Sequence, residues 1–390
     1  MENYDLNRMI LASNGVKFET IVSSTIKEAP HNSWGTSGIG TPTVIEIQHS
    51  EENNGTLIAS FAIFDSGLRE GKSTSFRIME STDGGENWEQ ISEVYETIDK
   101  GIEASWNPHL FELPEQVGNM PKGTLLLAGG SIDPGQKMKS HITIWRSYDC
   151  GLTWNQFTVV AEGGGLYAVD SSTRVDAGVW EPYLFYENGY LYCVYSDDTG
   201  DKINTPDQKI VYKRSNDGIT WEDSTDIVVA DQKHYRPGMG IIAKMGDGNF
   251  FIVYEIFGDW IACPLYYKIT DNIADWNPSN IGEEIKAIDG YTMGGAPWCA
   301  WTPAGGKCGT LIVTGKYGKS QPNKLFVSFD CGKTFEVIDN PIPYSDSCIM
   351  GGYSSSLFFS KDGSTLFYST AVENSGGKAK IVFKKIKIHE

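Results

Sequence analysis

The chain of 390 residues contains no run of eighteen apolar residues, which excludes a transmembrane helix. Its first residues, Met-Glu-Asn-Tyr-Asp-Leu, have neither the basic nor the apolar region of a signal peptide. We therefore expect either a cytoplasmic protein or a secreted one whose leader has been removed, and the sequence leaves the compartment open.

Positive charge is scarce. The 32 Lys and Arg residues face 50 Asp and Glu residues, which gives a net charge of −18. Such a charge argues against nucleic acid or an anionic membrane surface as a partner. It also disfavours an acidic polymer as substrate, so a neutral polysaccharide or oligosaccharide fits better. We expect a monomer.

Cysteine and histidine are few and dispersed. The seven Cys and six His residues show no spacing typical of metal ligands, so we expect neither a metal nor a cofactor. Ser residues lack the context of a nucleophile elbow, and Gly163-Gly-Gly165 lacks the strand-to-helix setting of a phosphate loop. The cysteines are interpreted as buried or turn thiols, two of which, Cys150 and Cys331, fall inside a repeated motif.

That motif, Ser-x-Asp-x-Gly-x-Thr-Trp, is the strongest pattern in the chain. Copies begin at Ser81, Ser147, Ser215 and Ser328, and a decayed copy at Ile269; neighbouring starts lie 54 to 68 residues apart. Ser and Asp oxygens accept hydrogen bonds from backbone N–H groups in a tight turn, and Gly supplies a positive φ. The aromatic residue is expected to pack the turn onto its own sheet. We interpret the motif as structural, one copy per propeller blade.

Strand-like runs occur throughout the chain, and the sequence shows no long amphipathic helix. Six of them have the position of the second strand of a four-stranded blade: residues 55–60, 123–128, 190–195, 249–254, 309–314 and 364–369. We therefore predict an all-β fold, a six-bladed β-propeller, as one domain spanning residues 1–390. Strands near residues 16–21 and 378–389 should share one blade and close the ring, which removes open sheet edges.

Two acidic residues lie in apolar surroundings. Glu181 is predicted on the first strand of a blade, within Gly178-Val-Trp-Glu-Pro-Tyr-Leu-Phe185, and Glu255 on the second strand of the next blade. Burying a carboxylate is costly unless it is paired or used, although either residue alone could face solvent. Together, pointing toward the central axis, they suggest the two carboxylates of a glycosidase.

Other candidates surround them. Tyr353, predicted on the first strand of the last blade, could hydrogen-bond a carboxylate or simply pack a sheet. Arg236 could bind a sugar hydroxyl, hold a carboxylate ionised, or form a structural salt bridge. Several tryptophans are candidates for stacking on sugars, although blade packing also accounts for them: Trp106, Trp180, Trp298 and Trp301.

With these segments identified, the chain resembles sialidase-fold proteins and, more narrowly, the exo-α-1,5-L-arabinanases of glycoside hydrolase family 93. The resemblance extends from about residue 40 to about residue 360. It rests on these segments: Trp180-Glu-Pro-Tyr-Leu184, Tyr195-Ser-Asp197, Arg236-Pro-Gly-Met239, Tyr254-Glu255, Pro108-His-Leu-Phe-Glu-Leu-Pro-Glu115, Gly123-Thr-Leu-Leu-Leu-Ala-Gly129 and Gly352-Tyr-Ser354.

The resemblance implies a retaining hydrolase that releases arabinobiose from the non-reducing end of linear arabinan. Glu181 then corresponds to the nucleophile, Glu255 to the acid/base, and Tyr353 to the residue that hydrogen-bonds the nucleophile. Arg236, Trp180, Trp106, Asp197 and Trp298 are expected to bind substrate.

Two alternatives stay open. A sialidase, acting on another sugar, would share the fold, but its first arginine is missing: the corresponding stretch reads Gly38-Ile-Gly-Thr-Pro-Thr-Val44. The second alternative is a propeller that binds sugar or protein without turnover. The sequence does not fix the product size, the sugar, or which glutamate has which role.

Overall fold

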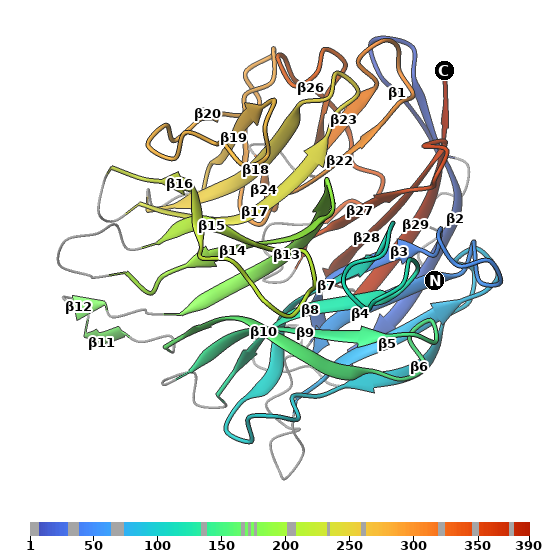
Figure 1. Ribbon diagram of the computed structural model, residues 1–390. Coiled ribbons are helices and arrows are strands. Elements are labelled where there is room, and N and C mark those ends of the chain that lie inside the picture. The colour runs from blue at the N-terminus through green and yellow to red at the C-terminus, as the bar shows by residue number, and fades with distance from the viewer. Residues whose placement is uncertain are drawn as a thin grey trace.

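The molecule is a six-bladed β-propeller, as the computed structural model shows (Figure 1). It describes residues 8–29, 39–63, 74–133, 139–164, 168–170, 173–174, 178–200, 208–231, 235–258, 263–318, 324–344, 351–373 and 378–390. No helix occurs in these ranges, and so none long and apolar enough to cross a membrane. The prediction of an all-β propeller is confirmed.

Each of the first three blades is an antiparallel sheet of four strands in chain order. Blade 1 contains β3 (Ile39–Glu46), β4 (Leu57–Ile63), β5 (Phe76–Ser81) and β6 (Glu89–Val94). Blade 2 contains β7 (Glu103–Glu112), β8 (Leu125–Ile132), β9 (Ser140–Ser147) and β10 (Asn155–Gly163). Blade 3 contains β13 (Val179–Glu187), β14 (Tyr190–Asp197), β15 (Lys209–Ser215) and β16 (Thr225–Val229).

The next two blades repeat this order. Blade 4 contains β17 (Arg236–Lys244), β18 (Phe250–Phe257), β19 (Leu265–Thr270) and β20 (Glu283–Glu284). Blade 5 contains β22 (Trp298–Thr302), β23 (Thr310–Thr314), β25 (Lys324–Ser328) and β26 (Glu336–Asp339). Two short ribbons accompany the blades, β11 (Ala168–Asp170) with β12 (Thr173–Arg174), and β21 (Met293–Gly294) with β24 (Tyr317–Gly318).

Blade 6 joins the two ends of the described chain. It contains β27 (Ser356–Phe359), β28 (Thr365–Glu373), β29 (Ala379–His389), β2 (Lys17–Glu28) and β1 (Met9–Leu11). β2 pairs with β29 along their whole length, from Lys17 opposite His389 to Glu28 opposite Lys380. The predicted closure of the ring is therefore confirmed, and both ends of the ribbon lie at this blade (Figure 1).

The first strands of the blades line the central axis. Each contacts the first strand of the next blade, in the order β3, β7, β13, β17, β22, β27 and back to β3. The six runs predicted as second strands are the second strands of their blades. This arrangement brings residues from all six blades to the axis.

The repeated motif forms the predicted turns. In blade 1, Ser81 Oγ donates to Asp83 (2.8 Å), while the N–H of Gly85 donates to Ser81 Oγ (2.9 Å). Its aromatic residue, however, packs on the neighbouring blade as well. Trp88 meets Phe383 of blade 6 edge to face at 5.2 Å between ring centroids, and its Nε1 donates to Ser24 Oγ. The motif therefore joins adjacent blades, because the turn lies at the seam between them.

The thiol interpretation is wrong for two cysteines. Cys308 and Cys331 form a disulfide, with Cα atoms 5.2 Å apart. The antiparallel order β22, β23, β25 places the β22–β23 turn and the motif turn at the same end of blade 5, which a reading of spacing alone cannot reveal. The remaining described cysteines are thiols, and Cys348 lies outside the described residues: Cys150, Cys193, Cys263 and Cys299.

Candidate active site

A β-bulge recurs at one end of the first strand. In blade 3, Glu181 and Pro182 together lie opposite Tyr195, and in blade 4 two residues of β17 face one residue of β18. The first residue of each bulge has a positive φ, +61° at Glu181 and +57° at Met239. Four further residues share this conformation: Thr41 (+49°) and Asn107 (+45°) in the bulges of β3 and β7, and Ala296 (+45°) and Ser354 (+54°) two residues before β22 and β27. We call these six the bulge residues.

This conformation costs about 1–3 kcal/mol for a residue other than glycine. A bulge also changes the direction in which a side chain points. Because the first strands surround the axis, the six strained residues form a ring at one end of it. Such strain concentrates where function requires it, and Glu181 is one of the six.

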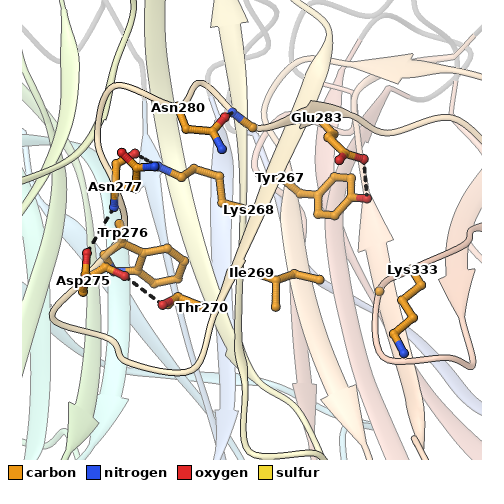
Figure 2. A pocket seen from close by; sticks show the side chains of 12 residues that line it. Tyr267, Lys268, Ile269, Thr270, Asp275, Trp276, Asn277, Asn280, Glu283 and Lys333 are labelled. Carbon is orange, nitrogen blue, oxygen red and sulfur yellow. Dashed lines mark hydrogen bonds between the residues drawn. The ribbon is translucent and has the colours of Figure 1, made fainter.

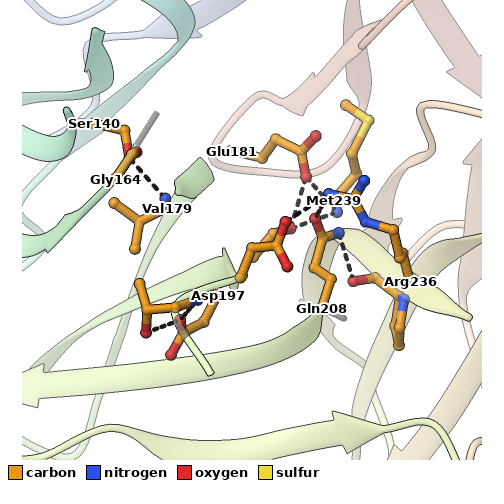
Figure 3. Close-up of polar contacts among 12 residues, drawn as sticks. Ser140, Gly164, Val179, Glu181, Asp197, Gln208, Arg236 and Met239 are labelled. Carbon is orange, nitrogen blue, oxygen red and sulfur yellow. Dashed lines mark hydrogen bonds and ion pairs between the residues drawn. The ribbon is translucent and has the colours of Figure 1, made fainter. Parts of the chain in front are cut away.

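Glu181 is held by two donors. The Ser196 hydroxyl on β14 and the backbone N–H of Met239 on β17 both donate to its Oε2, at 2.7 and 2.9 Å (Figure 3). Burial raises the pKa of Glu181, while these two hydrogen bonds act in the opposite direction. The carboxylate is therefore oriented by groups that stabilise its ionised form.

Glu255 lies on β18, opposite Gly238, and accepts a hydrogen bond from the N–H of Ala296 (2.6 Å). Burial, reinforced by the negative charge of Glu181, raises the pKa of Glu255 to about 7. The structure thus brings the two predicted carboxylates within electrostatic reach of each other. One of the two can be protonated while the other is ionised.

Tyr353 joins this pair. It lies in a turn three residues before β27 rather than on the first strand itself, because the sheet pairing of blade 6 begins only at Ser356. Burial and the charges of Glu181 and Glu255 raise its pKa well above the usual value. The phenol consequently keeps its proton and can serve as a hydrogen-bond donor.

Lys316 is a site residue that the sequence reasoning missed. Its side chain is 2% exposed, and its Nζ lies 5.8 Å from the ring centre of Tyr353 and 5.1 Å from that of Tyr317. The backbone N–H of Lys316 donates to the carbonyl oxygen of Gly295, the residue before the bulge residue Ala296. Glu255 occupies the equivalent position in blade 4, because it lies opposite Gly238, the residue before the bulge residue Met239. A charged residue just after a predicted second strand is the signal that could have revealed it.

Arg236 forms the salt bridge left open above. Its Nη2 donates to Asp198 (2.9 Å) and to Gln208 (2.7 Å), and all three side chains are buried (Figure 3). Gln208 Nε2 also donates to the carbonyl of Pro237. This network anchors the start of β17, three residues before Met239, the donor to Glu181.

Asp197 lies next to this network. Its Oδ1 accepts hydrogen bonds from the N–H (2.9 Å) and hydroxyl (2.6 Å) of Thr199. The buried Asp198, which the sequence reasoning did not single out, is the residue that faces Arg236.

The tryptophans divide into two groups. Trp106 and Trp180 are half-buried and directly precede the bulge residues of blades 2 and 3. Trp298 is 7% exposed, packs on His109 and Tyr183 at 5.6 and 5.9 Å, and donates through Nε1 to Leu357. Trp301 lies near the other end of β22, where its Nε1 donates to the carbonyl oxygen of Cys308 in the β22–β23 turn.

A cavity of the structure lies away from these residues. Its volume is about 640 Å³. It lies between the outer strands of blade 4 and the motif turn of blade 5, lined by Tyr267, Lys268, Trp276, Asn280, Glu283 and Lys333 among others (Figure 2). Neither carboxylate of the candidate site takes part in it. Also within the described residues, no group of three or more His, Cys, Asp or Glu side chains is placed to hold a metal ion.

Solved structures match this chain, whereas no protein-family model and no curated protein sequence does. The GH93 α-L-arabinofuranosidase of Fusarium graminearum, in complex with arabinobiose, superposes with a TM-score of 0.80 at 27% identity. The same values describe the α-L-arabinanase of Penicillium chrysogenum, also with arabinobiose. Both matches cover 94% of this chain and 98% of the other.

The chain is similar to glycoside hydrolases of family GH93. A Hadza microbial sialidase matches at a TM-score of 0.61 and 13% identity, over 94% of this chain and 68% of the other. That more distant likeness shows the shared propeller fold alone. The GH93 likeness supports a glycosidase.

Proposed function

We propose that this protein is a retaining, exo-acting glycoside hydrolase that cleaves α-1,5-linked L-arabinan from its non-reducing end and releases arabinobiose. The observation that carries the proposal is the coupled pair Glu181 and Glu255, with the pKa of Glu255 raised to about 7. The two similar enzymes were solved with arabinobiose bound, which supports an oligosaccharide of arabinose as substrate.

Glu255 is the proposed acid/base. With a pKa near 7 it is substantially protonated at neutral pH, so it can give its proton to the glycosidic oxygen as the bond to the anomeric carbon breaks. In the second half of the reaction the same carboxylate, now ionised, accepts a proton from the attacking water. A pKa close to the working pH suits both steps.

Glu181 is the proposed nucleophile. The hydroxyl of Ser196 and the N–H of Met239 bind one of its oxygens, which supports an ionised and fixed carboxylate. Attack on the anomeric carbon expels the leaving sugar, whose oxygen takes the proton of Glu255, and leaves a glycosyl ester on Glu181. Water then attacks the same carbon, transfers its proton to Glu255, and frees Glu181.

Tyr353 is proposed to act beside the nucleophile. Both glutamates raise its pKa, which supports a neutral phenol close to the two carboxyl groups. Such a donor can weaken the negative charge on Glu181 when the ester breaks. The ammonium of Lys316, near the ring of Tyr353, supports a fixed ring orientation.

The remaining predicted residues have different environments. Trp106 and Trp180 stay our proposed stacking residues, since both are half-buried and directly precede the bulge residues of their blades. Arg236 and Asp197 are proposed to contribute through the shape of the site, since their hydrogen bonds run to protein groups. Trp298 is proposed to support the site by packing on His109 and Tyr183.

The test is hydrolysis of linear α-1,5-arabinan by the purified protein, with sizing of the first products and NMR of their anomeric configuration. We expect arabinobiose as the first product, formed with retained configuration. Arabinose or a ladder of longer oligomers would contradict the product size, and an inverted first product would contradict the mechanism. Sialyllactose serves as the comparison substrate and should stay intact.

A further inference from the structure

Blades 1 and 2 place two polar side chains where blade 3 places Glu181. Thr41 lies in the bulge of β3, between the pairs Gly40–Ala62 and Thr43–Ser60. Asn107 lies in the bulge of β7, between Trp106–Gly130 and His109–Ala128. Both have the positive φ of the ring, at +49° and +45°.

Both side chains are buried, with exposed fractions of 1% for Thr41 and 8% for Asn107. Across the part of the chain that the structure describes, Thr41 Oγ1 and Asn107 Oδ1 have no hydrogen-bond partner. A buried polar atom without a partner costs free energy, so such atoms are rare and need an explanation. Two of them at equivalent positions of a six-fold ring point to one explanation for both.

The comparison with Glu181 explains why the partners are missing. The Glu181 side chain is long enough to reach the N–H of the bulge residue in the next blade, Met239. The side chains of Thr41 and Asn107 are shorter by one or two bonds, and the corresponding hydrogen bonds to the next bulge residue are not made. Their polar atoms thus lack the partner that the carboxylate of Glu181 finds.

We propose that Thr41 and Asn107 bind the hydroxyl groups of the sugar unit whose anomeric carbon faces Glu181, and that they help to select a neutral sugar. This inference rests on the proposed function. The other bulge residues agree with an uncharged ligand, since Glu181 is the one charged member among Thr41, Asn107, Glu181, Met239, Ala296 and Ser354. A hydroxyl and an amide match the donors and acceptors of a sugar without attracting an anion.

The test compares Thr41→Val, which removes the hydroxyl and keeps the shape, with Thr41→Ser, which keeps the hydroxyl. Asn107→Ala is measured beside them, and Ser75→Ala is the control. Ser75 is 4% exposed, its hydroxyl also lacks a partner among the described residues, and it precedes β5, the third strand of blade 1. Each variant is assayed for kcat/KM on linear arabinan, for arabinobiose affinity, and for Tm.

We expect Thr41→Val and Asn107→Ala to lower kcat/KM and arabinobiose affinity roughly tenfold each, the effect of one lost hydrogen bond. Thr41→Ser should restore activity, and Ser75→Ala should leave it unchanged. Tm of Thr41→Val should stay equal or rise, because an unsatisfied hydroxyl has been removed.

The outcomes separate the two proposals. An active wild type with unchanged kcat/KM in both variants overturns the sugar-binding role alone. A drop in activity that Thr41→Ser does not restore also overturns it, because it indicates a packing defect. A wild type that neither cleaves arabinan nor binds arabinobiose overturns the proposed function, and this inference with it.

Discussion

The backbone N–H of Met239 lies 2.9 Å from Oε2 of Glu181, so blade 4 orients a carboxylate that blade 3 carries. The approach depends on the residue before Met239. A Cβ at Gly238 would lie 3.2 Å from Glu181 Oε2 and 2.7 Å from Gln208 Nε2. This close approach of the backbone to Glu181 favours a glycine at position 238.

We expect Gly238→Ala to lower kcat by roughly 10- to 100-fold, because displacing a reacting group by about 1 Å has effects of this size. KM on linear arabinan should change little. The matched control is Gly240→Ala, two residues along the same strand, whose Cβ would meet apolar carbons of Ile210, Ile252 and Val194 at 3.1–3.3 Å. It should lower Tm with kcat retained; equal kcat losses in both variants would contradict the explanation.

Glu255 should determine how the activity falls at high pH. Its pKa of about 7 means that kcat/KM falls as pH rises above about 7, because the proton needed by the leaving group is lost. Measuring kcat/KM between pH 5 and 9 tests this. A profile that stays flat to pH 9 would show that another group supplies the proton.

The same pKa predicts a stability effect with a definite sign. Glu255 binds its proton more tightly in the folded protein (pKa about 7) than in the unfolded chain (4.5), so folding is weakened as pH rises through this range. Glu255→Gln mimics the protonated form. It should be about 3 kcal/mol more stable than the wild type at pH 8 and nearly equal at pH 4, by denaturant unfolding. The exposed Glu86, replaced by Gln, is the control and should show no such trend.

The disulfide gives a stability prediction that is independent of function. Cys308 and Cys331 close a loop with a sequence separation of 23 residues, and cross-links of this size contribute about 3 kcal/mol. Cys331→Ser should lower the free energy of unfolding by that amount, and a thiol reductant should have a similar effect on the wild type. Cys150→Ser is the matched control, since Cys150 is a thiol with φ of +53° at the same place in the turn of blade 2. Equal losses in both variants would show that turn geometry, not the bond, is responsible.

Much of the fold follows from local chemistry. The turn motif works through hydrogen bonds between residues two to four apart, such as Ser81 to Asp83, so the sequence displays it directly. Glu181 and Glu255 could be singled out because carboxylates stand out in apolar runs. The first bulge residue precedes a proline in four blades, a repeat that goes unnoticed unless the bulge is known: Thr41-Pro42, Asn107-Pro108, Glu181-Pro182 and Ala296-Pro297.

The parts that escaped prediction depend on contacts between blades. Arg236 could be recognised as important, but its partner Asp198 comes from the preceding blade, 38 residues earlier. Lys316 reaches Tyr353 from blade 5 to blade 6. No pattern along the chain encodes which side chains meet across such seams, because the meeting depends on the twist and register of two complete sheets.

The roles of the two glutamates can be separated by a small anion. If Glu255 is the acid/base, Glu255→Ala still forms the glycosyl ester from a substrate with a good leaving group, such as an aryl arabinobioside, and then stalls because water is not activated. Azide needs no proton removed and should attack the ester, so added azide should raise the rate at least tenfold and yield a glycosyl azide with the configuration of the substrate. Glu181→Ala lacks the ester and should, at most, give an azide of opposite configuration. Product NMR distinguishes the two, and finding the retained azide in Glu181→Ala instead would mean that the roles are exchanged.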